Sequence, residues 1–158
     1  MTAQTADKNS KPAAKKKSGG LAGVVAGETS ISEAGGAENL AYRGYSIYDL
    51  AEHADFEEVA YLLLYGVLPT QKQLDAYRDR LHEYCDLPET LKEVLERIPA
   101  AAHPMDVMRT AVSFLGTIEP EDKDRDDHQI CDRMIAAFPA VLAYWYHYSH
   151  HQDRISCY

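Results

Sequence analysis

Apolar residues recur at three- and four-residue spacing along most of the chain after residue 45, and this spacing places them on one face of a helix. Two residue pairs, Asp55 with Glu58 and Thr70 with Gln73, are typical of capping boxes, in which each side chain satisfies a backbone N–H of the first turn. The pattern predicts helices that begin after Ser46, Asp55, Thr70 and Pro88, near Pro104 and near His128.

The same pattern predicts where the helices end and which faces they bury. Gly66, Pro99 and Gly116 are expected to end three of them, because glycine and proline both interrupt helical backbone. Pro139 predicts a bend in the last helix, which should end near Ser149. The apolar stripes expected to face the core are Leu74, Tyr77, Leu81 and Tyr84, then Leu91, Val94, Leu95 and Ile98, then Met105, Met108, Val112 and Leu115.

The first 45 residues have a different character. Residues 1–19 contain Lys, Ala, Ser and Gly without periodicity and are expected to form a disordered basic tail. Residues 24–32 favour a strand, the two glycines at 35 and 36 favour a turn, and Leu40–Tyr42 favours a second strand. The expected fold class is mainly α, a multi-helical domain preceded by a small β-hairpin.

Charge is distributed unevenly along the chain. The net charge is −9, but residues 1–17 carry five lysines and one acid, which leaves −13 for the rest. An acidic body argues against nucleic-acid binding, which needs clustered Lys and Arg; the lysine-rich tail could touch RNA or an anionic surface, although a solvated tail is the simpler interpretation. Without a ~20-residue apolar run or the apolar core of a secretory signal, no membrane association and a cytoplasmic location are expected.

One candidate site lies where His103, Asp106 and Arg109 repeat every three residues along a predicted helix. Catalysis there needs a nucleophile or carbonyl site beside the histidine, and the sequence places none. A structural interpretation is therefore favoured, with His103 bonded at the helix entry and Asp106 paired with Arg109. The acidic run at 119–127 lacks the ligand spacing of a calcium loop and is expected to be solvated.

Further candidates lie near the C-terminal end. His147 and His151 are four residues apart and could hold zinc, but no acidic or sulfur ligand is fixed beside them, so no metal site is predicted. The aromatic run Tyr144–Tyr148 could stack on a ligand ring, yet it is more typical of a core or a subunit contact. Cys85 and Cys131 are typical of small core residues in a reduced protein.

Four segments follow one another in a recognisable order: GLAGVVAGETSIS, LAYRGYSIYDLAEHADFEEVAYLLLYGVLPT, AAHPMDVMRTAVSFLG and AAFPAVLAYWYHYSH. Together they resemble the citrate synthase family over residues 20–154, and HPMDVMRT with YWYHYSH makes the chain most similar to the bacterial 2-methylcitrate synthases. The resemblance implies a mainly helical homodimeric acyltransferase. Its substrates would be oxaloacetate and propionyl-CoA, giving 2-methylcitrate, or acetyl-CoA, giving citrate; acyl-CoA is a substrate, so no cofactor is implied.

The resemblance also implies the chemistry. In the family an Asp removes a proton from the acyl carbon, one His stabilises the resulting enol at the thioester oxygen, and a second His polarises the ketone of oxaloacetate. These residues belong to the C-terminal half of family members and have no counterpart here, so the chain is expected to be an N-terminal part that is inactive alone. Arg43 matches an arginine that lies near the CoA phosphates in some relatives; bracing a carboxylate is the alternative.

Residues 155–158 depart from the family pattern, so a non-native tail that includes Cys157 is a further expectation. Two other functions stay open at this point. One is a non-catalytic helical module that dimerises or binds a partner through the region of Trp145. The other is a non-functional remnant whose unpaired apolar face favours aggregation.

Overall fold

The computed structural model describes residues 27–34, 40–121 and 126–157 of the chain. The chain divides into two compact units, Met1–Ser30 and Ile31–Tyr158. In the first unit only residues 27–30 are described, and they form neither helix nor strand. The basic tail predicted for residues 1–19 lies outside the described residues, as do residues 24–26 of the first predicted strand.

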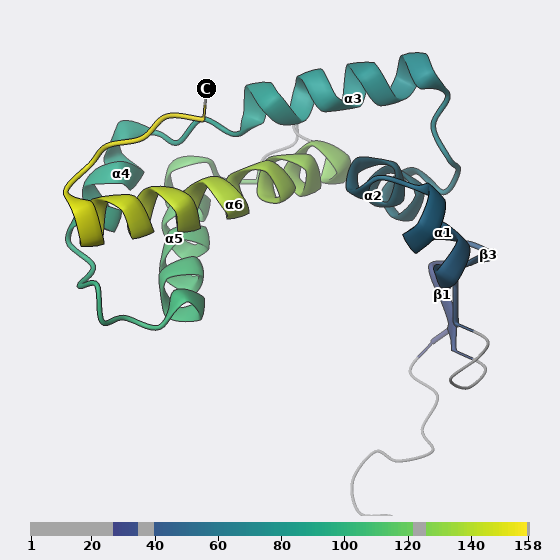
Figure 1. Cartoon of the computed structure of the whole chain (residues 1–158), viewed down its shortest axis with the longest axis horizontal. Helices are drawn as coiled ribbons and strands as arrows, with labels where there is room; N and C mark the ends of the chain where they lie inside the picture. Colours follow the sequence, from purple (N-terminus) through teal and green to yellow (C-terminus); the bar gives the residue numbers. More distant parts are fainter. Residues whose placement is uncertain (1–26, 35–39, 122–125, 158) are drawn as a thin grey trace, which may run out of the picture. The chain divides into compact units, whose positions relative to one another are not determined.

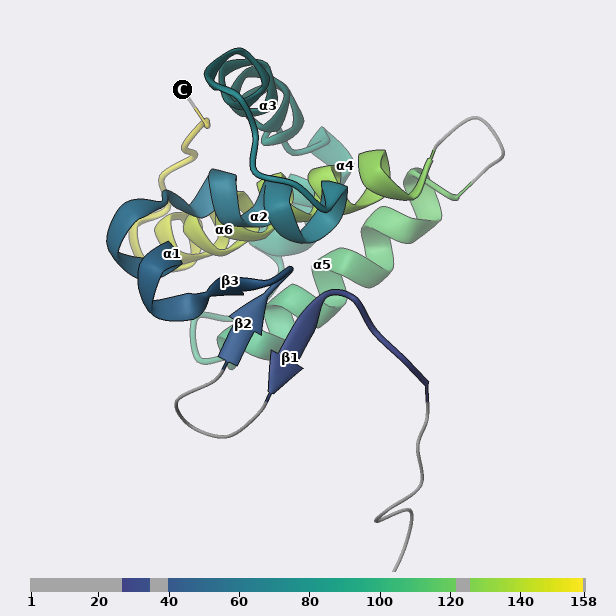
Figure 2. The ribbon, with the colours of Figure 1, turned by 90° about the vertical axis from the view of Figure 1, so that its right-hand side faces the viewer.

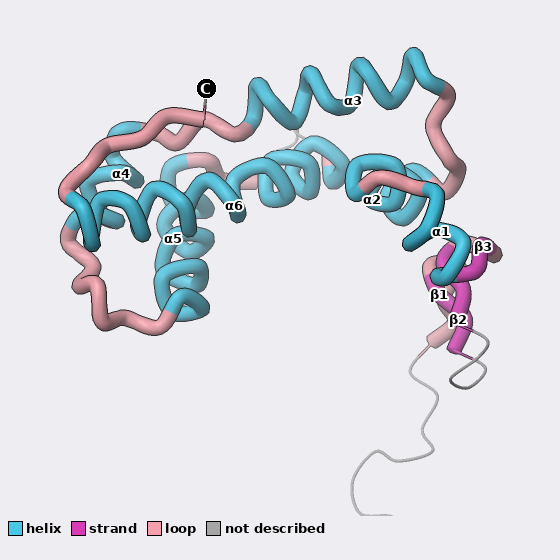
Figure 3. Tube along the Cα trace, viewed as in Figure 1, coloured by secondary structure: helices cyan, strands magenta, loops and turns pink. Residues whose placement is uncertain are grey.

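In the described part of the second unit, six helices follow a small sheet (Figure 1, Figure 3). The predicted fold class, mainly α with a small β element first, is confirmed. Among the helices described, none has the length and apolar character that a membrane span requires. In chain order the elements are β1 (Ser32–Ala34), β2 (Leu40–Tyr42), β3 (Tyr45–Ser46), α1 (Ile47–His53), α2 (Phe56–Tyr65), α3 (Gln71–Tyr84), α4 (Glu89–Glu96), α5 (Pro104–Ile118) and α6 (Asp127–His151).

The sheet is antiparallel, with β2 between β1 and β3 (Figure 2). The predicted hairpin is confirmed in its second strand, but the first strand begins only at Ser32, and the glycine turn lies outside the described residues. Strand β3 was not predicted. It is joined to β2 by Arg43 and Gly44, whose φ values of 50° and 87° are the pair of positive values that a tight two-residue hairpin turn requires.

Helices α1 to α3 begin where the capping residues predict. Ser46 Oγ accepts a hydrogen bond from the backbone N–H of Tyr48 at 3.3 Å, and both predicted capping boxes are present at the starts of α2 and α3. Gly66 ends α2 with φ at 84°, a left-handed conformation that glycine adopts without strain. These starts and this end are confirmed because each depends on contacts within a few residues.

Helix α6 is the longest element and contacts α3, α4 and α5 (Figure 1). The main core lies among α4, α5, α6 and Leu87, in the loop before α4. The apolar stripes predicted for α3 and α4 are confirmed at Leu74, Tyr77, Leu91 and Leu95, all of which are buried. The buried residues of the main core are Leu87, Leu91, Leu95, Val107, Met108, Ala111, Leu115, Ala137, Val141, Tyr144 and Trp145.

The stripe predicted for α5 is confirmed at Met108 and Leu115 but wrong at Met105, which is 67% exposed. The buried face passes instead through Val107, Ala111 and Leu115, which repeat every four residues. Gly116 does not end the helix, which continues to Ile118. A glycine inside a helix costs only about 1 kcal/mol relative to alanine, and the packing of Leu115 against the core outweighs that cost.

Trp145 is a core residue. Its side chain is 4% exposed, and its indole N–H donates to the carbonyl oxygen of Ile98 at 3.4 Å. The neighbouring Tyr144 is also buried, so the core interpretation of this aromatic run is confirmed for both residues. The Trp145 side chain itself is therefore not available to a partner, and partner binding through the surrounding region stays a hypothesis.

Candidate functional site

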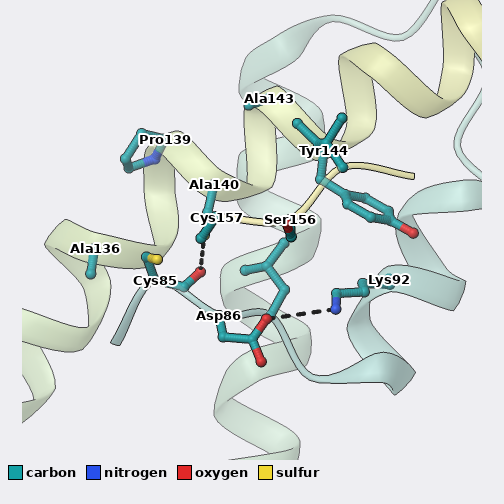
Figure 4. Close-up of a pocket in the computed structure, with 12 residues that line it drawn as sticks. Cys85, Asp86, Lys92, Ala136, Pro139, Ala140, Ala143, Tyr144, Ser156 and Cys157 are labelled. Carbon is teal, nitrogen blue, oxygen red and sulfur yellow. Dashed lines mark hydrogen bonds and ion pairs between the residues drawn. The ribbon is translucent and has the colours of Figure 1, made fainter. Parts of the chain in front are cut away.

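A cavity of about 280 Å³ lies beside α6, between the loop that precedes α4 and the segment that follows α6 (Figure 4). Its walls are mainly apolar, and α6 contributes Ala136, Pro139, Ala140 and Ala143 to them. Pockets for drug-sized ligands begin at about 300 Å³. The cavity can therefore admit a small group, but it is too small for a ligand the size of an acyl-CoA.

Polar residues of this cavity contact one another. The Sγ of Cys157 donates to the carbonyl oxygen of Cys85 at 2.9 Å, and Lys92 Nζ lies 3.6 Å from Asp86 Oδ1 (Figure 4). Burial raises the pKa of the Cys157 thiol to about 12, and the adjacent Cys85 thiol adds to the rise. Because the thiolate is the reactive form, Cys157 is a poor nucleophile near neutral pH.

The segment that follows α6 is fastened to α4 by ion pairs. Arg154 Nη1 lies 2.6 Å from Glu89 Oε1, and Arg154 Nη2 lies 2.7 Å from Glu96 Oε1. Tyr144 Oη donates to the same Glu96 oxygen at 2.6 Å. The hydroxyl of Tyr144 is the main cause that lowers the pKa of Glu96, and Arg154 acts in the same direction against the opposing effect of burial.

The lowered pKa of Glu96 predicts acid-sensitive stability. The unfolded chain takes up a proton near the ordinary glutamate pKa of about 4.3, whereas the folded chain does so only at lower pH. The contribution of Glu96 to stability is therefore fully present above the pKa of the unfolded chain. It is lost as the pH falls through the lower pKa of the folded chain. We expect the stability difference between the wild type and Glu96→Gln, measured by urea unfolding, to shrink between about pH 6 and about pH 3.

The matched control for this experiment is Glu93→Gln, because Glu93 lies on the same helix but is exposed. Its difference from the wild type should stay nearly constant over the same pH range. An equal pH dependence for both variants would contradict the prediction.

Arg43 lies in the turn between β2 and β3 and reaches the end of α2. Its Nη2 donates to the carbonyl oxygen of Leu63 at 2.9 Å. The last carbonyl groups of a helix carry partial negative charge, so a guanidinium group there stabilises both the helix end and the turn. This contact is structural, and the predicted role of Arg43 near CoA phosphates stays a prediction.

The residues of the HPMDVMRT segment have the favoured structural roles. His103 caps α5, where its Nδ1 accepts from the backbone N–H of Met105 at 3.2 Å. Arg109 Nη2 lies 3.0 Å from Asp106 Oδ1, and the two side chains are 80% and 60% exposed. Both parts of the structural interpretation are confirmed, and the active-site alternative gains no support from this geometry.

The C-terminal histidines are close together without forming a ligand cluster. The rings of His147 and His151 are 5.8 Å apart between centroids, and His150 stacks on Tyr146 at 4.4 Å. Over residues 27–34, 40–121 and 126–157, no three His, Cys, Asp or Glu side chains are grouped in a way that could hold a metal ion.

A buried ion pair between α3 and α6 was missed by the sequence reasoning. Asp132 is fully buried, and its Oδ2 accepts from Arg80 Nε at 3.0 Å and from Tyr65 Oη at 2.9 Å. Arg80 also donates to Tyr65 Oη at 2.8 Å. Burial, followed by the bond to Asp132, raises the pKa of Tyr65 to about 12. The arrangement stabilises the contact of α2 and α3 with α6.

A second buried charge, Arg133, was also missed. It donates to both carboxylate oxygens of Glu119, at 3.0 and 2.9 Å, and to the carbonyl oxygens of Tyr84 and Asp86. A signal was present in the sequence. Arg133 lies four and eight residues before Ala137 and Val141, on the apolar face of the last helix, where a charged residue indicates an internal partner.

Comparison with known proteins agrees with the fold. The family model described as "Citrate synthase, C-terminal domain" matches residues 20–157. A 2-methylcitrate synthase from Shewanella oneidensis is 57% identical over 144 residues, which cover 90% of this chain and 38% of that protein. The crystal structure of citrate synthase from Thermotoga maritima is 33% identical with a TM-score of 0.75, over 87% of this chain and 36% of that one.

A third relative has known ligands. The structure titled as the ternary complex of carboxymethyl coenzyme A and oxaloacetate with citrate synthase from Thermoplasma acidophilum is 25% identical with a TM-score of 0.76, over 85% of this chain and 36% of that one. The chain belongs to the citrate synthase family. It spans somewhat more than a third of the length of the relatives named here.

Proposed function

We propose that the chain is part of an enzyme that condenses propionyl-CoA with oxaloacetate to give 2-methylcitrate and CoA, with acetyl-CoA as the alternative acyl donor that gives citrate. The observation that carries the proposal is the 57% identity with the Shewanella oneidensis 2-methylcitrate synthase. The family resemblance supports a homodimer, and we place the enzyme in the cytoplasm.

The proposed reaction needs a base for a weak carbon acid and hydrogen-bond donors for the oxygen that gains negative charge. His103 caps a helix, Asp106 pairs with an exposed arginine, and the residues lining the cavity beside α6 include no histidine. We therefore assign the catalytic Asp and the two catalytic His to a part of the enzyme outside these 158 residues. This chain would supply the N-terminal part of the helical scaffold and would be inactive alone.

A chimeric enzyme tests the proposal. The 144 residues of the Shewanella oneidensis synthase that align with this chain are replaced by the aligned residues of this chain, and release of CoA is followed with a thiol reagent. We expect oxaloacetate-dependent CoA release with propionyl-CoA, and 2-methylcitrate as the product by mass spectrometry.

The experiment has two controls, the chain alone and the folding of the chimera. The 158-residue chain alone should fold, by circular dichroism, and release no CoA. Condensation by the chain alone would contradict the assignment of the catalytic residues to another part. A chimera that folds with native helical content but releases no CoA from either acyl-CoA would contradict the proposed function.

The chimera also tests the proposed role of Arg43. If its guanidinium group contacts a CoA phosphate, Arg43→Ala should raise the KM for acyl-CoA about tenfold or more, because hydrogen bonds to charged groups contribute about 1.5–3 kcal/mol. If Arg43 only braces the end of α2 through Leu63, the melting temperature should fall while KM stays unchanged. Arg43→Lys is the conservative control, because it retains the charge without the planar fork.

A further inference from the structure

We propose that Cys85 and Cys157 form a redox-sensitive thiol pair, which closes into a disulfide and fastens the segment after α6 to the loop before α4. Neither cysteine is assigned a part in the proposed reaction, so the thiol pair is independent of the proposed function. The pair forms because the chain beyond α6 is held against the rest of the fold.

The two cysteines already touch. The Sγ of Cys157 lies 2.9 Å from the carbonyl oxygen of Cys85, although 72 positions separate the residues in sequence (Figure 4). A disulfide needs Cα atoms about 4.4–6.8 Å apart, and side-chain rotation then brings the sulfur atoms together. The thiol of Cys157 thus lies against the residue with which it would pair, and both residues line the same cavity. The third cysteine, Cys131, is on α6 and does not line this cavity.

Three features of the preceding residues position Cys157. Gln152 ends α6 in a left-handed conformation, with φ at 58°, which turns the chain back toward the fold. Arg154 is then fixed by Glu89 and Glu96, and Ile155 packs against the main core. The position of Cys157 is therefore set by an ion-pair clamp and an apolar contact, in addition to its own thiol.

A small disulfide, such as oxidised glutathione, can oxidise the two thiols. The half-buried Cys85, as a thiolate, attacks the small disulfide, forms a mixed disulfide and releases one thiolate that takes up a proton. Cys157 then loses its proton, attacks the Cys85 sulfur and releases the second small thiol. Two protein thiols become one disulfide, and one small disulfide becomes two small thiols.

The environment of Cys157 makes the second step slow near neutral pH. Its thiol has a pKa raised to about 12 by burial, so only a small fraction is thiolate. Closure should accelerate as the pH is raised, because the thiolate is the attacking species. Brief exposure to a small disulfide should therefore leave the pair reduced, and longer exposure should close it.

The test uses the full 158-residue chain incubated with oxidised glutathione and then digested without reduction. We expect a monomer that has lost two hydrogens and a linked peptide pair containing Cys85 and Cys157. Cys131→Ser should give the same linked pair, whereas Cys85→Ser and Cys157→Ser should give none. The closed loop of about 70 residues should raise the melting temperature of the oxidised wild type and of Cys131→Ser by several degrees.

Each other outcome overturns the proposal. A disulfide that includes Cys131, a cross-linked dimer, or a stable glutathione adduct on Cys85 after long incubation at about pH 9 would show that the pair does not close. Equal melting temperatures for the oxidised and reduced wild type, with the linked peptides present, would show that the bond does not fasten the segment.

Discussion

Replacing Arg133 with alanine is expected to lower the free energy of unfolding by about 3–5 kcal/mol, because removal of one partner leaves a buried ion pair uncompensated. The Arg133 side chain is 8% exposed and donates to both carboxylate oxygens of Glu119. It also satisfies two backbone carbonyl groups at the end of α3 and in the loop that follows. Alanine would leave all of these acceptors without their donor.

The position of Arg133 explains why a single residue has such a large effect. It lies on α6, and its partners come from the end of α5 and from the connection between α3 and α4. The side chain therefore joins α6 to the end of α5, 14 positions earlier, and to the connection between α3 and α4, 47 and 49 positions earlier. Since a domain of this size has a net stability of only about 5–15 kcal/mol, much of the population should unfold at temperatures that the wild type tolerates.

Urea unfolding followed by circular dichroism measures this effect. The matched control is Arg109→Ala, which removes an arginine from an ion pair on α5 that is almost fully solvated. Its cost should lie within about 0.5 kcal/mol of zero. A loss below about 1 kcal/mol for Arg133→Ala, or equal losses for both variants, would contradict the role assigned to Arg133.

Trp145→Ala should destabilise the chain by a similar amount, about 3–5 kcal/mol, through a cavity in the main core. The indole ring is buried among residues of α4, α5 and α6, and its N–H donates to the Ile98 carbonyl oxygen. Alanine removes the packing and also leaves that carbonyl oxygen without its donor. Trp145→Phe should cost less, because most of the apolar volume stays in place.

Tyr146→Ala is the control for Trp145→Ala, because Tyr146 is the next residue along the same helix and is 50% exposed. Its cost should be about 1 kcal/mol or less, since little buried volume is lost. Thermal unfolding of the three variants is followed by circular dichroism at 222 nm. Tryptophan fluorescence is unsuitable as the probe, because Trp145 is the single tryptophan of this chain. A loss for Tyr146→Ala as large as that for Trp145→Ala would contradict the assignment of Trp145 to the core.

Local chemistry made most helix starts predictable. The capping pairs Asp55 with Glu58 and Thr70 with Gln73 act over three residues, so their effect can be deduced without a fold. The buried face of α5 was partly wrong because Met108 and Leu115 fit two overlapping stripes, and only the position of α6 selects the one through Val107. Strand β3 was missed because Arg43-Gly44 is a less recognisable turn pair than Asn-Gly.

The buried charges depend on partners far away in sequence, and the pattern alone could not identify them. Asp132 pairs with Arg80 across 52 positions, and the carbonyl groups that Arg133 binds come 47 and 49 positions earlier. Cys157 and Cys85, which are in contact, are 72 positions apart in sequence. For the candidate site, the sequence identified the structural roles of His103 and the Asp106–Arg109 pair, but the cavity beside α6 arises only when the chain after α6 folds back.

The proposed function is tested most directly by oxaloacetate-dependent CoA release by the protein captured from its source cells with an antibody to residues 70–100. The captured protein should convert propionyl-CoA and oxaloacetate to CoA and 2-methylcitrate. The captured polypeptide should have a mass well above the 17.7 kDa of these 158 residues. Captured, folded protein that releases no CoA from propionyl-CoA or acetyl-CoA in the presence of oxaloacetate would contradict the proposed function.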